Sequence, residues 1–537
     1  MRAWRRIYQT VTDEGRRFFS ELDRPGQKQE AVLWEILQKN ADTLYGRQHH
    51  FSSIKTIQDY RDNVCITTYE QLSDHIQRIG NGENNILTAE AVEVFEETGG
   101  STKGPKRIPY TKSSLLAFQK ALYPWLYNLL THRQKIMTGS AYWSISPALR
   151  LNHATSAEIP VGLASDADYF GEKLSTDLSY VLTLPPAVGA VSDFDSWQYL
   201  TLRYLIASRD LSLISVWSPT FLLDLVTAMS DYSELLLDDI IHQRLSMPLP
   251  EGVAPDDLPP VVIEDERLSE LKAAFHGGGI DTGLLWPNLD TISCWLDASA
   301  ACYRHRLDLL FPNVYLQAKG LLATEGAISI PVCGAAGSVL ANNSGFYEFV
   351  DTNGVVCLAH ELKESEIYKV IMTTYSGLYR YDIGDQVVVT GFLDKTPLVK
   401  FTGRTGLTSD LCGEKLTEDF VLEQLHDIVA EAMLIPDLGE KPGYVLLLEQ
   451  AKYSSEGAET QVGIIEKRLW ANPQYAYARR IGQLAPLKPL RIRNLWRRYA
   501  EYQCNKGRRL GDIKPTILSD DLSLCAHIRD NSTALTQ

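Results

Sequence analysis

The sequence predicts an α/β protein with a large N-terminal domain, residues 1–403, and a smaller, mobile α+β C-terminal domain, residues 404–537. The chain has 537 residues, and a single hydrophobic core stops growing at about 250–300 residues, so two or more domains are expected. Up to residue 403, short β-rich runs alternate with helical patterns, as is typical of α/β folds. Gly403-Arg404-Thr405-Gly406 then forms a natural joint, and the sequence pattern changes after it.

Hydrophobic spacing predicts the elements of the large domain in order. Residues 1–50 have the spacing of amphipathic helices. Residues 113–130 are apolar at helical spacing, with Thr111 or Ser113 as N-cap. Further helices are expected over 220–229 and 298–310. The expected strands are 289–296, 328–332, 346–350, 370–375, 386–392 and 398–401.

Beyond the joint, the smaller domain mixes both element types. Helices are expected over 418–432 and 459–471, with a strand at 444–449 between them. A basic stretch then runs to Arg509. The sequence therefore predicts an α+β arrangement here.

Composition excludes several protein classes. The net charge of −15 argues against a nucleic-acid-binding surface, which would carry a basic field. No apolar stretch reaches about 18 residues, so neither a transmembrane helix nor a membrane partner is expected. The eight cysteines are scattered, with no Cys-x-x-Cys pair, which favours reduced thiols in a cytoplasmic protein over disulfides or a zinc site.

A glycine-rich segment, Thr98-Gly99-Gly100-Ser101-Thr102-Lys103-Gly104-Pro105-Lys106, is the most informative part of the chain. Glycines let backbone N–H groups surround an anion, and hydroxyls and Lys106 add donors for phosphate oxygens. The segment is neither a Walker A motif nor a Gly-x-Gly-x-x-Gly motif. It predicts a polyphosphate site, hence a nucleotide; a polar surface turn is an equally common origin of such a segment.

Two carboxylates and two lysines further along could complete such a site. Glu325 follows an apolar run and could hold Mg²⁺ against ATP, although a charged turn residue is the commoner explanation of that pattern. Asp385 follows a glycine, at an expected turn between strands, and could accept hydrogen bonds from ribose; a hairpin Gly-Asp turn is the alternative. Lys415 and Lys506 could reach phosphates when the small domain closes, or could be solvated surface charges.

The residue Tyr347, in Ser344-Gly345-Phe346-Tyr347-Glu348-Phe349, could stack on a base or belong to a core strand.

In this order, the clusters resemble the adenylate-forming enzymes, whose phosphate loop reads Thr-Ser-Gly-Thr-Thr-Gly-x-Pro-Lys. More closely, the chain resembles the acyl-acid amido synthetases of the auxin-responsive Gretchen Hagen family, especially their bacterial members. The resemblance covers nearly the whole chain. It is carried by residues 43–47, 97–111, 285–289, 319–331, 345–349, 379–385 and 472–479.

The resemblance implies a role for each candidate residue. It assigns phosphate binding to Thr98, Gly99, Gly100, Ser101, Thr102 and Lys106, Mg²⁺ binding to Glu325, the AMP site to Thr324 and Tyr347, and ribose binding to Asp385. Lys415 falls where the family has a nucleotide-contacting lysine, and Lys506 matches the C-terminal catalytic lysine of a Lys-x-Pro-Arg pattern. Two departures stand out: Gly99 replaces a hydroxyl residue, and Arg508 replaces the proline, which keeps Lys514 as a second candidate.

The implied activity is formation of an acyl-AMP from a carboxylic acid and Mg-ATP, followed by acyl transfer to an amino acid or another amine. An acid–thiol ligase that forms an acyl-CoA or acyl-carrier thioester is one alternative, and a non-catalytic nucleotide-binding protein is another. Residues 110–220, including Trp143 and Trp217, are expected to line the acyl pocket, although core aromatics give the same pattern. The sequence identifies neither the acid, nor the amine, nor the oligomeric state.

Overall fold

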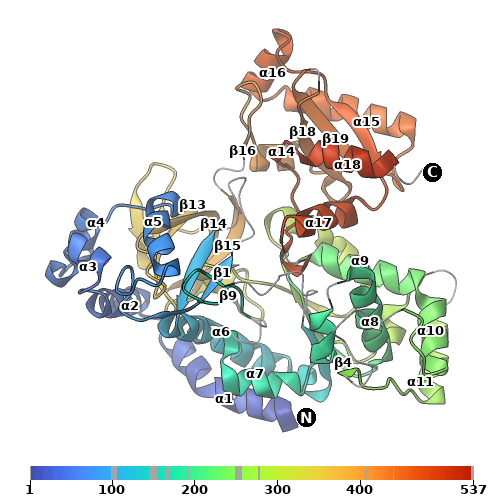
Figure 1. Cartoon of the computed structure of the whole chain (residues 1–537), viewed down its shortest axis with the longest axis horizontal. Coiled ribbons are helices and arrows are strands. Elements are labelled where there is room, and N and C mark those ends of the chain that lie inside the picture. The colour runs from blue at the N-terminus through green and yellow to red at the C-terminus, as the bar shows by residue number, and fades with distance from the viewer. Residues whose placement is uncertain are drawn as a thin grey trace.

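The computed structural model describes residues 2–97, 106–143, 154–163, 169–191, 193–247, 257–275, 279–404, 408–439, 441–508 and 510–533. It has a large body built around two sheets, with the C-terminal part packed above it in the view of Figure 1. This is the predicted α/β architecture with a smaller C-terminal α+β region.

The helices predicted over residues 1–50 are confirmed as α1 to α3, and two further helices, α4 and α5, follow them. Their bounds are α1 Arg2–Ser20, α2 Pro25–Lys39, α3 Leu44–Gln48, α4 Ile57–Asn63 and α5 Tyr69–Gly80. The α1 helix buries Trp4, Ile7 and Val11, which lie on one face at helical spacing. It packs along α6, Lys112–His132. The Thr111 hydroxyl caps α6 by accepting a hydrogen bond from the Ser114 amide, which confirms one of the two predicted caps.

An antiparallel seven-stranded sheet occupies one side of the body, in the order β12-β11-β13-β14-β15-β10-β9. The predicted strands of this region are confirmed, with longer bounds for several. The bounds are β9 Ser329–Pro331, β10 Ser338–Leu340, β11 Phe346–Val350, β12 Val356–Leu358, β13 Ile367–Thr373, β14 Tyr381–Leu393 and β15 Thr396–Arg404. Two small hairpins stand beside it: β1 Val92–Glu97 with β2 Arg107–Thr111, and β7 Leu322–Ala323 with β8 Gly326–Ala327.

The expected turn at Asp385 is wrong, because Asp385 lies inside β14. Ile371 pairs with Asp382 and Lys369 with Gln386, so three residues of β14 stand opposite the single Val370. Gly384 takes a φ of 77° within this bulge. A glycine in a strand pattern marks a bulge as readily as a turn.

The other side of the body holds a parallel sheet in the order β3-β4-β5-β6. Its strands are β3 Ser140–Trp143, β4 Leu211–Ser215, β5 Thr291–Cys294 and β6 Tyr315–Ala318. The helices of this part are α7 Glu172–Ser179, α8 Phe194–Ala207, α9 Pro219–Asp231, α10 Ser233–Ile241, α11 Asp265–Ala274, α12 Thr282–Leu285 and α13 Arg304–Leu310. The predicted helix over 298–310 is a 3₁₀ segment to Tyr303, followed by α13. Parallel strands align their carboxyl ends along one edge, where ligands bind in α/β sheets.

The C-terminal part has a three-stranded sheet covered on both faces. Its strands are β18 Ala432–Asp437, β19 Gly443–Glu449 and β20 Lys488–Ile492, after a short pair β16 Thr408–Ser409 and β17 Leu416–Thr417. Its helices are α14 Glu418–Gln424, α15 Ser455–Leu469, α16 Pro473–Arg480, α17 Leu495–Asn505 and α18 Leu524–Thr533. Leu434 packs with α15 on one face, whereas its neighbours Met433 and Ile435 pack with α17 and α18 on the other.

The predicted helix over 418–432 is wrong in its second half. The α14 helix ends at Gln424, and Ala432 begins β18. A short apolar run fits a buried strand as well as a helix, and burial on both faces makes residues 432–435 a strand.

Candidate nucleotide and acyl-acid site

The carboxylate of Asp385 is buried between β14 and β15. Its side chain is 1% exposed, and Oδ1 accepts a hydrogen bond from Arg404 Nε at 2.6 Å. Arg404 lies directly opposite in the strand register. The second oxygen, Oδ2, is buried and has no hydrogen-bond partner within the described part of the chain. Because buried polar atoms are nearly always paired, this oxygen points to a ligand that donates a hydrogen bond.

The second candidate carboxylate, Glu325, stands with Thr324 at the tip of the β7–β8 hairpin. The Tyr110 hydroxyl donates to the Thr324 carbonyl at 2.6 Å and so fixes the hairpin. Burial raises the pKa of Glu325, and the positive charge of Arg404 opposes that shift. The Asp385 charge adds to the increase and the Lys106 charge reduces it, so all three groups lie within electrostatic reach of Glu325.

Of the two C-terminal lysines, Lys514 lies at this cluster. Its ammonium group stands 5.1 Å from the ring centroid of Trp295 and 5.5 Å from that of Phe401, both in the large body. The side chain keeps a solvent-exposed surface, yet the surrounding protein lowers its pKa, and the charge of Arg404 acts in the same direction. The negative charges of Asp385, Glu325 and Glu418 oppose this shift. A side chain that is both solvent-accessible and surrounded by protein lines a cleft.

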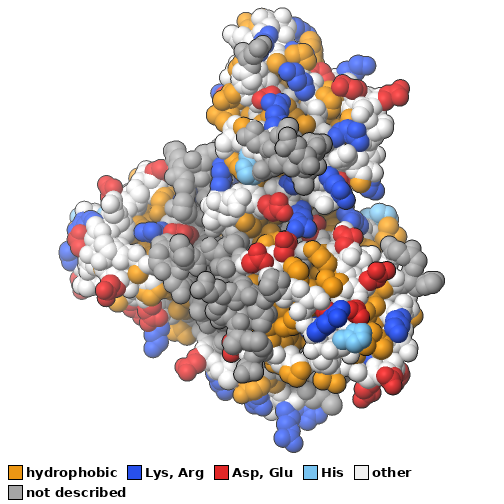
Figure 2. Space-filling model, turned by 45° about the vertical axis from the view of Figure 1, so that its right-hand side comes forward, with side chains coloured by type: hydrophobic (Ala, Val, Ile, Leu, Met, Phe, Trp, Pro, Cys, Tyr) orange, Lys and Arg blue, Asp and Glu red, His pale blue; other side chains and the backbone are white. Residues whose placement is uncertain are grey.

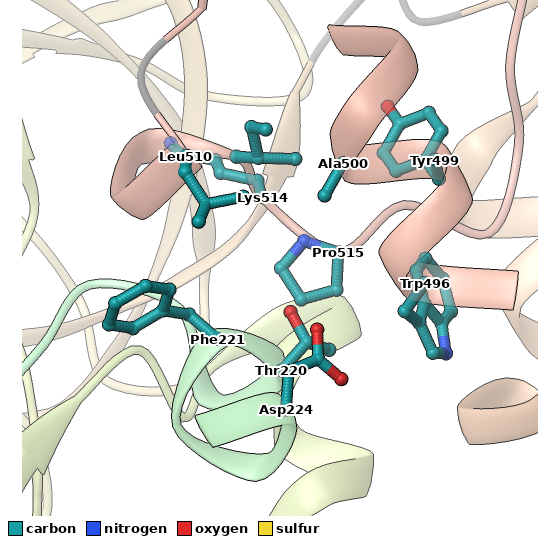
Figure 3. A pocket seen from close by; sticks show the side chains of 10 residues that line it. Thr220, Phe221, Asp224, Trp496, Tyr499, Ala500, Leu510, Lys514 and Pro515 are labelled. Atoms are coloured by element: carbon teal, nitrogen blue, oxygen red, sulfur yellow. The ribbon is translucent and has the colours of Figure 1, made fainter. Parts of the chain in front are cut away.

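The two residues that follow Lys514 are held by both parts of the molecule. Ser299 of the large body donates from Oγ to the Pro515 carbonyl at 2.8 Å, and Thr516 donates to Glu418 at 2.8 Å. A cavity of about 280 Å³, counting the part open to solvent, lies beside this segment and is lined by Thr220 and Asp224 of α9 and by Trp496 of α17 (Figure 3). Acidic and basic side chains also lie side by side on the surface where the C-terminal part meets the body (Figure 2).

The other proposed lysines lie elsewhere in this conformation. Lys506, at the end of α17, forms an ion pair with Asp521 at 2.5 Å and stands 4.6 Å from the Tyr502 ring centroid. Lys415 is exposed between β16 and β17, with a φ of 47°. Its neighbour Glu414 is buried and accepts hydrogen bonds from the backbone amides of residues 411 and 412.

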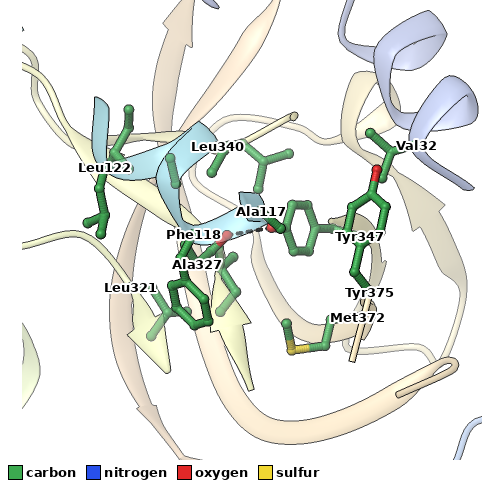
Figure 4. Packing of buried hydrophobic residues seen from close by; sticks show 14 of the residues in the cluster. Val32, Ala117, Phe118, Leu122, Leu321, Ala327, Leu340, Tyr347, Met372 and Tyr375 are labelled. Carbon is green, nitrogen blue, oxygen red and sulfur yellow. Dashed lines mark hydrogen bonds between the residues drawn. The ribbon is translucent and has the colours of Figure 1, made fainter. Parts of the chain in front are cut away.

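The core of the antiparallel sheet holds Tyr347. It is 1% exposed, and its hydroxyl bonds to Ser344 Oγ at 2.7 Å and to the Ala327 carbonyl. Figure 4 shows the ring packed among apolar side chains, with that bond drawn. The structure therefore places Tyr347 beneath the β8 strand, and its role at the AMP site stays a prediction.

The phosphate-loop residues Thr98, Gly99, Gly100, Ser101 and Thr102 lie outside the described residues. The strands on either side are paired up to the ends of the loop, with Glu97 opposite Arg107. Lys106 stands 5.4 Å from the Tyr69 ring centroid. The electrostatic effect of Lys106 on Glu325 ties this end of the loop to the carboxylates.

Tryptophans gather at the carboxyl edge of the parallel sheet. Trp143 ends β3, Trp217 follows β4, and Trp295 follows β5. Trp217 and Trp295 have ring centroids 5.6 Å apart, and Trp143 lies 5.6 Å from Trp125 of α6. The predicted pocket residues Trp143 and Trp217 thus stand on one edge of the sheet.

Sequence reasoning did not assign a role to three residues of the site: Arg404, Trp295 and Trp125. Arg404 is 19 positions from Asp385 and meets it only through the β14–β15 register. In the sequence, the one feature that singles out Arg404 is its position in the glycine-rich joint between the domains. Trp295 lies at the end of an expected strand, and only helical spacing describes Trp125.

Within the described residues, no group of three or more His, Cys, Asp or Glu side chains could hold a metal ion. None of the described helices combines the length and the apolar composition that crossing a bilayer requires.

Comparisons with known proteins agree with this architecture. Residues 16–316 match the GH3 family N-terminal domain, and residues 338–404 match the GH3 family central domain. The indole-3-acetic acid-amido synthetase GH3.4 of Arabidopsis thaliana is 24% identical over 426 residues, which cover 75% of this chain and 71% of that protein. The jasmonoyl--L-amino acid synthetase JAR6 of Nicotiana attenuata is 24% identical over 433 residues, covering 74% of this chain and 73% of the relative.

A solved structure, AtGH3.15 acyl acid amido synthetase in complex with 2,4-DB, superposes with a TM-score of 0.82 at 19% identity. The superposition covers 98% of this chain and 96% of the solved chain, so the two proteins share a fold throughout. The two family matches together span more than half of this chain, which therefore belongs to the GH3 family.

Proposed function

We propose that this chain is an ATP-dependent acyl-acid amido synthetase, which activates a carboxylic acid as an acyl-AMP and transfers the acyl group to an amino acid or another amine. The observation that carries the proposal is Asp385, in a chain of the GH3 family. One of its oxygens is held by Arg404, and the other is buried without a partner in the described part of the chain. That oxygen suits the hydroxyl donors of a ribose.

The residues also fit a magnesium ion bound together with phosphate. Burial disfavours the ionised form of Glu325, and a nearby cation would restore it. Mg²⁺ usually takes one or two carboxylates plus phosphate oxygens, so a single glutamate matches this mode of binding. When bound, Mg²⁺ would supply charge neutralisation on the phosphates.

In the first half-reaction, a carboxylate oxygen of the acid attacks the α-phosphorus, and the bond from that phosphorus to pyrophosphate breaks. Asp385 would orient the ribose, and the positive charges of Lys514 and Lys106 would stabilise charge that develops on the transferring group. In the second, the amine nitrogen attacks the acyl carbon, the carbon–oxygen bond to AMP breaks, and the amine loses a proton.

We assign the role of C-terminal lysine to Lys514 and not to Lys506. The assignment is supported by the position of Lys514 near Asp385 and Glu325, whereas Lys506 is paired with Asp521. Phosphate binding by Thr98, Gly99, Gly100, Ser101 and Thr102 belongs to the proposal, as does lining of the AMP site by Thr324. So does contact of Lys415 with the nucleotide after a movement of the small domain.

The division into residues 1–403 and 404–537 is part of the same proposal. It is supported by the separate apolar clusters on the two faces of the C-terminal sheet. We also propose a cytoplasmic location, supported by the eight cysteines, which are all described and all free thiols. Affiliation with the bacterial members of the family rests on the sequence resemblance alone.

The direct test is ATP–pyrophosphate exchange across a panel of carboxylic acids, with and without Mg²⁺. Exchange that requires both an acid and Mg²⁺ is expected. Active acids are then incubated with ATP and either amino acids or CoA, and the products are identified by mass spectrometry. Amide products support the proposal, thioesters would favour the acid–thiol ligase, and absence of exchange with every acid would favour a non-catalytic nucleotide-binding protein.

A further inference from the structure

The lysine Lys319 is buried at the indole-lined edge of the parallel sheet. It directly follows β6, as Trp143 ends β3 and Trp295 follows β5. The Lys319 amide bonds to the Cys294 carbonyl at 2.9 Å, so its backbone continues the register of the sheet. Lys319 is therefore part of the same edge on which ligands of α/β sheets bind.

The ammonium group of Lys319 sits between two indoles. Its Nζ is 5.1 Å from the ring centroid of Trp125 and 4.9 Å from that of Trp217, and it donates to Ser215 Oγ at 2.9 Å. The residue is 7% exposed. Cation–π contacts offset part of the cost of burying an ammonium, which is high in apolar surroundings.

Hydrogen bonds hold the indole of Trp125 in place. Trp125 Nε1 donates to Gln317 Oε1 at 2.8 Å, and Ser293 Oγ donates to the same oxygen at 3.2 Å. Gln317 and Ser293 lie on the neighbouring strands β6 and β5 and are buried. The fold therefore fixes the Trp125 indole and the Ser215 hydroxyl, and these two groups set the position of the Lys319 ammonium.

A cavity adjoins Lys319. It measures about 220 Å³, counting the part open to solvent, and its other walls are mainly apolar: Leu122, Leu322, Ile330 and Pro331. Lys319 is thus a charged group on an apolar wall. A few polar groups set into mainly apolar walls orient ligands in pockets of this kind.

The same indoles connect Lys319 to the reaction site. The Trp217 ring centroid lies 4.9 Å from the Lys319 ammonium and 5.6 Å from the ring centroid of Trp295. The ring centroid of Trp295 in turn lies 5.1 Å from the Lys514 ammonium. An acid whose carboxylate reacts near Lys514 would lay its apolar body along these rings and direct its far end toward Lys319.

We infer that Lys319 is a specificity-determining residue, and that the acyl acid carries a hydrogen-bond acceptor or an anionic group at the end distal from its reacting carboxylate. This inference rests on the proposed function. The apolar body of the acid stacks on Trp217 and Trp295, and the distal group accepts a hydrogen bond from the Lys319 ammonium.

The test compares acids that differ only in the distal group. Pyrophosphate exchange is measured with 4-methylphenylacetate, 4-hydroxyphenylacetate and 4-carboxyphenylacetate, with heptanoate and heptanedioate, and with matched analogues of any other acid that supports exchange. For the wild-type protein, kcat/KM is expected to be about 10- to 100-fold higher for the acceptor-bearing member, in the range of one hydrogen bond to a charged group.

Two variants then assign the preference to the residue. Lys319→Met should abolish it, and Lys319→Gln should retain part of the preference for the hydroxyl-bearing acid and lose that for the second carboxylate. Lys120→Met is the matched control, because Lys120 of α6 also stands over an aromatic ring, with its ammonium 5.3 Å from the ring centroid of Tyr375. This variant should leave the kcat/KM ratio of each pair of acids unchanged.

A wild-type protein that prefers the apolar member of each pair, or shows no preference, overturns the inference without any variant. So does a Lys319→Met protein that loses activity with both members equally, because a purely structural lysine would act that way. In both cases exchange with some acid still stands, and the proposed function with it. Absence of exchange with every acid refutes the proposed function instead, and the inference falls with it.

Discussion

Replacing Asp385 with asparagine should separate ligand binding from stability. The variant keeps the shape of the side chain and places a neutral amide where one carboxylate oxygen is buried without a partner among the described residues. A charge-assisted hydrogen bond contributes about 1.5–3 kcal/mol, so the KM for ATP and the dissociation constant of AMP should rise roughly 10- to 150-fold.

Folding should change much less. The only ion pair of Asp385 among the described residues joins it to Arg404, whose side chain is 51% exposed. In the variant Arg404 stays solvated and the asparagine oxygen can still accept its hydrogen bond, while the buried charge of the carboxylate is removed. The free energy of unfolding, measured by urea titration without ligand, should therefore change by less than about 1 kcal/mol.

The matched control is Asp382→Asn, on the same strand. Asp382 is paired with Lys369 at 2.7 Å and accepts from the Gly384 amide at 2.9 Å, so its oxygens have partners. ATP affinity should be nearly unchanged in this variant. An Asp385→Asn protein that binds ATP normally, or that loses several kcal/mol of stability, would refute the assignment of Asp385 to the ligand.

Three further outcomes are expected. Glu325→Gln should abolish Mg-dependent exchange while the urea midpoint is kept or raised, because burial already disfavours the charge; exchange near the wild-type rate would remove Glu325 from the metal site. Lys514→Ala should slow acyl-AMP formation by at least about 10²-fold, with a smaller effect on the reaction of supplied acyl-AMP with the amine, whereas Lys506→Ala should leave both steps nearly intact; the reverse pattern in rapid-quench assays would return the role to Lys506. Burial raises the pKa of Asp224 to about 7, so its neutral form is favoured by folding and stability is lost as pH rises from about 4 to 7; the melting temperature of Asp224→Asn should fall less than that of the wild type over this range, and parallel curves would show that Asp224 ionises normally.

Much of the fold could be predicted because apolar periodicity is local. The helix over residues 113–130 and the strand over 346–350 follow from side-chain spacing that the tertiary structure merely buries. The apolar residues 432–435 fit a helix and a strand equally well in the sequence. The strand is buried on both faces, which removes the alternation of polar and apolar residues that would identify it. Asp385 was expected at a turn, because a glycine before it gives the same local signal in a bulge.

The candidate site was predicted in its parts and not in its assembly. Glu325 and Asp385 were picked out by their local settings, but their shared partner Arg404 depends on a strand register that no short motif encodes. Lys506 fitted the family pattern better by spacing, and only the path of the chain after α17 brings Lys514 to the carboxylates. Pairings across such distances are set by topology, which lies outside what residue order within a motif can specify.

Residues 514–519 are attached more firmly to the C-terminal sheet than to the large body. Toward the C-terminal sheet the attachment is strand-like: the Leu434 amide donates to the Ile517 carbonyl at 2.8 Å, and the Ser519 amide donates to the Leu434 carbonyl at 2.9 Å. Toward the large body, the Ser299 hydroxyl provides one side-chain bond. If the two parts separate, the weaker attachment yields first and Lys514 travels with the small domain. The withdrawal of one positive charge would then weaken the hold on bound phosphate groups, so that product dissociation is built into the same motion that opens the site.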